Sequence, residues 1–133
     1  MNQIELNDIE VASPSVVHAA ARGFATAIAG TPQFKAFEQA YEALNKDTVA
    51  QQTLSAYQAK AKSLRAILML NAASETERTE LESLKKDYMT HATVQAYAAA
   101  ESELTVLCQQ AAEMISAATG LNYAASCGAS CCG

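Results

Sequence analysis

The sequence predicts an all-α protein: an antiparallel helical bundle of four to five helices, with two long central helices and a flexible cysteine-rich C-terminal tail. Three observations support this prediction. Apolar residues recur at helical spacing along most of the chain. The helical stretches are separated by capping or breaking residues. Alanine, rather than large aromatic residues, supplies much of the 50% hydrophobic content, which favours closely packed helices.

The 133 residues fit a single domain. We expect a flexible N-terminus over residues 1–12, a helical bundle domain over residues 13–123 and a cysteine- and glycine-rich tail over residues 124–133. A core this poor in large side chains is often completed by self-association, so a homo-oligomer, most simply a dimer, is expected.

The first two helices are delimited by proline and glycine. Ser13 and Pro14 form a typical helix start, and Gly30 ends the helix. Thr31 and Pro32 repeat the start signal for a second helix, which runs to the turn at 45–47. The inward stripes of the two helices are predicted to be Val17, Ala20, Ala21, Phe24 and Ile28, and then Phe34, Phe37, Tyr41 and Leu44.

Three further helices follow. With Asp47 as cap, a long helix is predicted from Thr48 to about Asn71, and Ser74 with Glu77 forms a capping box for the next. The last helix should run from Ala92 to Thr119 and end at Gly120. The apolar positions of the two long helices step by three and four, as in a heptad seam: Ala50, Leu54, Tyr57, Ala61, Leu64 and Leu68, and then Leu104, Cys108, Ala111, Ile115 and Ala118.

Charge and hydropathy exclude several classes of function. The net charge is −5 and no lysine or arginine cluster appears, so direct binding of nucleic acid is not expected. The N-terminal ten residues lack the pattern of a secretory signal, and the longest strongly apolar stretch, 66–70, is too short to span a membrane. We therefore expect a cytoplasmic protein whose thiols are reduced, which disfavours a disulfide framework.

The tail "SCGASCCG" carries Cys127, Cys131 and Cys132, spaced by small residues. A shared metal site, a thiol redox switch and an end without function are the three interpretations. The spacing C-x3-C-C is an incomplete metal motif, because adjacent cysteines tend to point apart and four ligands are normally needed. The missing ligands would have to come from another subunit.

Other candidate residues have structural explanations. Cys108 falls on the predicted seam, where packing is the expected role. His18 and His91 lack partners at i+3 or i+4, which favours surface or capping roles. Glu101 falls on the predicted inner face, and a bundle edge, a partner contact or a buried pair with Arg22 or Arg65 would explain it. The aromatic pairs Phe34/Phe37 and Tyr57/Tyr97 are attributed to the core. No catalytic pair or phosphate loop is recognisable, so no enzyme is expected.

Four segments in order resemble the YlbF/YmcA family of small helical bacterial regulators: "GTPQFKAFEQAYEAL", "LSAYQAKAKSL", "VQAYAAAESELTVL" and "MISAATGLNYAASCG". The resemblance covers about residues 14 to 128. It implies an all-helical, self-associating, non-enzymatic adaptor that assembles with related helical subunits and a third, different protein. That complex carries iron–sulfur clusters and a flavin, assists an endoribonuclease in messenger-RNA processing, and influences competence, sporulation and biofilm formation.

The resemblance further implies that Cys127, Cys131 and Cys132 help to hold an iron–sulfur cluster at a subunit junction, with flavin binding only within a larger complex. Two alternatives stay open: a stand-alone metal-binding or thiol redox-sensing helical protein, and a purely structural helical oligomerisation module.

Overall fold

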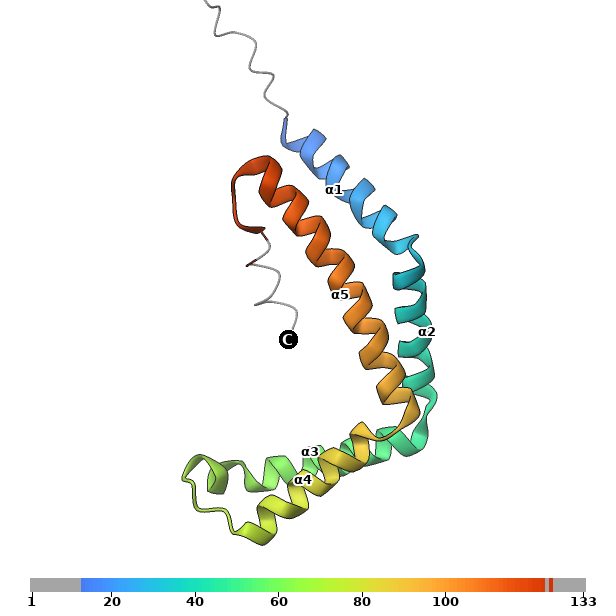
Figure 1. Cartoon of the computed structure of the whole chain (residues 1–133). Coiled ribbons are helices and arrows are strands. Elements are labelled where there is room, and N and C mark those ends of the chain that lie inside the picture. Colours follow the sequence, from blue (N-terminus) through green and yellow to red (C-terminus); the bar gives the residue numbers. More distant parts are fainter. Residues whose placement is uncertain (1–12, 124, 126–133) are drawn as a thin grey trace, which may run out of the picture. The chain divides into compact units, whose positions relative to one another are not determined.

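The computed structural model describes residues 13–123 and 125. These residues form five α-helices: α1 (Pro14–Ala29), α2 (Pro32–Lys46), α3 (Thr48–Met69), α4 (Glu75–Met89) and α5 (Ala92–Thr119) (Figure 1). The prediction of an all-α, antiparallel helical protein is confirmed. The predicted N-terminus, 1–12, and almost all of the tail, 124–133, lie outside the described residues. The chain divides into two compact units, one ending at Thr31 and the other beginning at Pro32.

Local capping chemistry determines where the helices begin. Asp47 caps α3, since its Oδ1 accepts a hydrogen bond from the Ala50 backbone N–H at 3.0 Å. Ser74 and Glu77 form the predicted capping box of α4: the Ser74 side chain accepts from the Glu77 N–H, and the Glu77 carboxylate accepts from the Ser74 N–H. These bonds satisfy backbone donors that a helix start leaves without intrahelical partners.

The helix ends follow equally local rules. Gly120 ends α5 in the left-handed region, with φ 74°, where glycine has no steric penalty. Asn71, with φ 55°, takes the same region in the turn between α3 and α4, and its Oδ1 accepts from the Arg78 guanidinium at 2.8 Å. Asparagine tolerates this conformation better than most residues. The helix boundaries predicted from the sequence are therefore confirmed to within about two residues.

The second unit is built from two antiparallel helix pairs, α2 with α5 and α3 with α4 (Figure 1). The pairs meet where α2 passes into α3 and α4 passes into α5. A small core lies at this meeting point and consists of Leu44, Ala50 and Val94, with Tyr88 and Tyr97 packed against it. Ala50 is fully buried, so a larger side chain there would displace its neighbours.

The two longest described helices, α3 and α5, do not share the seam that the sequence suggested. Each packs along a shorter partner, and the two meet only near their N-terminal ends, at Ala50 and Val94. The reason is that two helix breaks lie side by side: the α2–α3 turn at Asp47 and the α4–α5 turn at Thr90–His91. At these two turns, the α2–α5 pair ends and the α3–α4 pair begins.

Leu64 tests the α3–α4 pair. It is 5% exposed on α3, whereas neighbouring Ser63 is exposed. We expect Leu64→Asp to lower the free energy of unfolding by at least about 3 kcal/mol, because it removes a packed side chain and buries a charge. Chemical denaturation followed by circular dichroism measures this loss, and Ser63→Asp is the matched control. Similar midpoints for the two variants would show that this face of α3 has been misidentified.

Candidate functional site

The junction between the two helix pairs is held by Asp47. Its Oδ1 caps α3, and its Oδ2 accepts a hydrogen bond from the Thr93 hydroxyl, on the first turn of α5, at 2.7 Å. One carboxylate thus joins two helix N-termini, through a hydrogen bond between residues that lie 46 positions apart in sequence. The Ala50 N–H and the Thr93 hydroxyl both favour the ionised form, and they hold the pKa of Asp47 below its ordinary value.

His91 forms a second link across the junction. Its Nε2 lies 3.1 Å from Thr53 Oγ1 on α3. The same Thr53 hydroxyl lies 2.9 Å from the Val49 carbonyl oxygen, so it takes part in contacts both to its own helix and to His91. His91 therefore occupies the N-cap position of α5 while its ring bridges to α3, which agrees with the structural role predicted for it.

An aromatic cluster holds α2 against α5. The Tyr97 ring lies 5.4 Å from Phe37 and 6.3 Å from Tyr41 between centroids, and Phe34 lies 6.5 Å from Phe37. Burial raises the pKa of Tyr97, and nearby Glu101 adds to the effect. The attribution of these rings to helix packing is supported, although Tyr97 pairs with α2 rather than with Tyr57 on α3.

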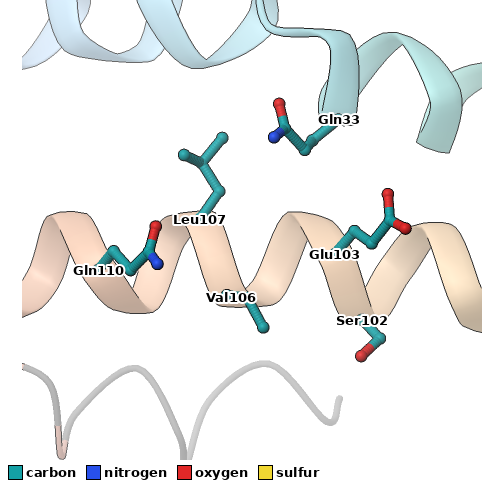
Figure 2. A pocket seen from close by; sticks show the side chains of 6 residues that line it. All are labelled: Gln33, Ser102, Glu103, Val106, Leu107 and Gln110. Carbon is teal, nitrogen blue, oxygen red and sulfur yellow. The ribbon is translucent and has the colours of Figure 1, made fainter.

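An open groove lies between the start of α2 and the middle of α5. Its volume is about 330 Å³, and Figure 2 shows Gln33 and Leu107 directed toward each other across it. Its lining mixes amides, a hydroxyl and a carboxylate with apolar side chains: Gln33, Ser102, Glu103, Val106, Leu107 and Gln110. A second hollow, of about 490 Å³, lies on α4 and is lined by hydroxyl and carboxylate side chains: Glu75, Thr76, Thr79, Glu80 and Ser83.

The predicted ligands Cys127, Cys131 and Cys132 lie outside the described residues. Among the side chains that the structure describes, no group of three histidine, cysteine, aspartate or glutamate residues is placed to hold a metal ion. His18 is exposed on α1. Glu101 is also exposed, which corresponds to the bundle-edge interpretation and removes the need for a buried cationic partner.

The prediction that Cys108 packs in the core is wrong, because its side chain is exposed. The spacing of the seam on α5 was correct, but its burial depends on a partner helix. At 1.5 Å per residue, the 28 residues of α5 extend about 42 Å, whereas the 15 residues of α2 extend about 22 Å. Residues beyond the start of α2 therefore have no cover from it.

Large apolar side chains remain exposed on α5 beyond α2, where Met114 is 75% and Ile115 is 40% exposed. In the first unit, α1 likewise has no buried residue along its fully described length. Val16, Val17 and Phe24 are all about half exposed on it. Exposed apolar surface of this kind is typical of interaction sites. Both stripes have the spacing of inward faces, but spacing does not show whether a partner helix covers them. For α5, the predicted helix lengths already contain the signal, since α5 is much longer than α2.

None of the described helices combines the length and the apolar character needed to cross a membrane.

Comparison with known proteins identifies a family. A family model described as "Control of competence regulator ComK, YlbF/YmcA" matches residues 17–119, which is most of the chain. No curated protein and no solved structure matches this chain.

The lowered pKa of Asp47 makes junction stability depend on pH. The stabilisation is present above the pKa of the unfolded chain and is lost as the pH falls below about 4. Asp47→Asn should lower the melting temperature at neutral pH and flatten part of the loss on acidification. Thermal melts from pH 7 to pH 3 test this, with exposed Asp87→Asn removing the same charge outside the junction. A pH profile for Asp47→Asn that matches the wild type would contradict the role of the carboxylate.

Proposed function

Since the chain belongs to the YlbF/YmcA family of competence regulators, we propose that it is a non-enzymatic adaptor subunit of a multi-protein complex. The complex supports ribonuclease-dependent processing of messenger RNA in the cytoplasm, and through it competence, sporulation and biofilm formation. The chain contacts its helical relatives and a third subunit rather than the RNA. Its net charge of −5 supports this division of roles.

The observation that carries the proposal is the character of α1. Arg22 is the one lysine, arginine, aspartate or glutamate among its 16 residues, and no residue of this fully described helix is buried. A helix with so little charge is normally covered by other apolar surface. A helix that docks on a partner accounts for it, because binding would remove Val17 and Phe24 from water.

The three tail cysteines would supply thiolates to an iron–sulfur cluster at a subunit junction. Thiolates are the normal ligands of such clusters, so the donor chemistry fits, but three sulfurs are one short of the usual four. The remaining ligand would come from a neighbouring subunit. Flavin, if bound, would belong to the larger complex.

A thiol redox sensor is the second candidate function. The exposed thiol of Cys108 favours it, because oxidation requires access to solvent and reagents. A purely structural oligomerisation module is the third candidate. The two experiments that follow test the docking role and the cluster role of the adaptor against these two alternatives.

Phe24→Glu tests the docking role of α1. Phe24 is 47% exposed, so the charge should cost little folding stability but should block burial against a partner. In a host strain lacking the native gene, we expect this variant to co-purify with far less of the other subunits and to fail to restore competence. Ala25→Glu, which adds the same charge one residue along the exposed helix, is the control. Full restoration of competence by Phe24→Glu, with unchanged complex formation, would reject the docking role.

Replacing Cys127, Cys131 and Cys132 together by serine tests the cluster. In complexes purified anaerobically from the native host, we expect iron and acid-labile sulfide to fall to background, because the thiolate ligands are lost. Cys108→Ser should keep the metal and, since this side chain is exposed, should leave stability close to that of the wild type. Unchanged iron in the triple variant would leave the redox and structural candidates.

A further inference from the structure

The C-terminal half of α5 presents an apolar surface that continues past the start of α2. We call this surface, formed by Cys108, Ala111, Met114, Ile115 and Ala118, the distal face of α5. Four of these side chains are exposed and Ala111 is half-buried. In Figure 1, α2 lies beside only the N-terminal half of α5, and the groove residue Gln33 marks where that cover ends.

The spacing of the distal face fits a second helix. Cys108, Ala111, Ile115 and Ala118 step by three, four and three residues, which is the pattern of a helix that packs along another helix. The pattern reads the same in both directions about the midpoint of Ala111 and Ile115. In an antiparallel pair of identical helices, Ala111 would therefore face Ile115, and Cys108 would face Ala118. The large Ile115 meets the small Ala111, and Cys108 and Ala118 are both small, so the two helices can approach closely.

Charge and steric fit also favour an antiparallel pair of copies. The charged residues of α5 are Glu101, Glu103 and Glu113, and none of them belongs to the distal face. In a parallel pair, the α2 helix of each copy would occupy the space needed by the other copy's α5. An antiparallel overlap confined to the two C-terminal halves keeps both α2 helices clear, and it opposes the two helix dipoles favourably.

We infer that the distal face of α5 binds the same face of a second copy of this chain, as an antiparallel, two-fold symmetric helix pair. The inference rests on the self-association that the sequence and the family resemblance imply for the proposed adaptor, and it names the surface used. Such an interface is isologous, because the same residues contribute from both sides. About three helical turns are buried, so the dimer is weak and depends on concentration.

A disulfide between copies tests this geometry. In the full chain with Cys127, Cys131 and Cys132 replaced by serine, Ala118→Cys adds a thiol that would face the native Cys108 of the partner. Within one helix, these two positions lie about 15 Å apart, too far for a disulfide within the chain. Mild oxidation should therefore produce a covalent dimer, measured by non-reducing electrophoresis and by intact mass.

The control is Ala117→Cys in the same background, since Ala117 is also exposed but projects from the other side of α5. We expect several-fold more covalent dimer from Ala118→Cys, and loss of that dimer when Cys108→Ser is added. Light scattering of the unmodified chain over the same concentrations provides the second readout.

Self-association and the use of the distal face as its interface are tested separately by these measurements. If light scattering shows dimers but the two cysteine variants crosslink equally, self-association holds and the distal face is not the interface. If light scattering shows only the 14.0 kDa monomer and no selective crosslink forms, the expected self-association of the chain fails as well, while docking of α1 on other subunits is tested separately by Phe24→Glu.

Discussion

The carboxylate of Asp47 is the interaction on which the arrangement of the second unit depends. It caps α3 through Ala50 and binds the Thr93 hydroxyl at the start of α5, so one side chain fixes two helix starts. Around it, Leu44, Ala50 and Val94 exclude water, and the contact between His91 and Thr53 adds a second polar link. Because the α2–α3 and α4–α5 turns lie side by side, α2 to α5 form two successive helix pairs rather than four helices around one core.

This arrangement has a consequence for the surface. Each helix pair is only two helices thick, so little of the chain is fully buried; Leu64, Ala100 and Ala112 are the buried apolar residues outside the junction core in the described chain. Because α5 is longer than α2, its apolar stripe continues past its partner. The α1 helix has the same character in the first unit. A fold that leaves apolar helix faces uncovered is suited to an assembly subunit, whose folding and binding use the same kind of surface.

The proposed function assigns different roles to the helices and to the C-terminal cysteines. In it, the helices would supply faces for docking, and the three C-terminal cysteines would supply thiolates where subunits meet. Assembly would bring together ligands that one chain does not provide alone, so cluster formation and complex formation would be thermodynamically linked. A change in iron supply or in oxidation would then alter assembly, which gives a regulatory subunit a chemical input.

The sequence by itself determined the helices. Prolines, Asp47, the Ser74–Glu77 capping box and Gly120 act within a few residues of themselves, so their effects are readable locally. The family resemblance also followed from the order of local motifs. Only the tertiary structure decided which helix covers which face. Cys108 and Glu101 have the spacing of an inner face but are exposed, because burial requires a partner helix that covers the side chain at that position. Which positions a partner helix covers depends on how helix ends that are distant in sequence come together, as Asp47 and Thr93 do. The sequence of one helix does not contain this information.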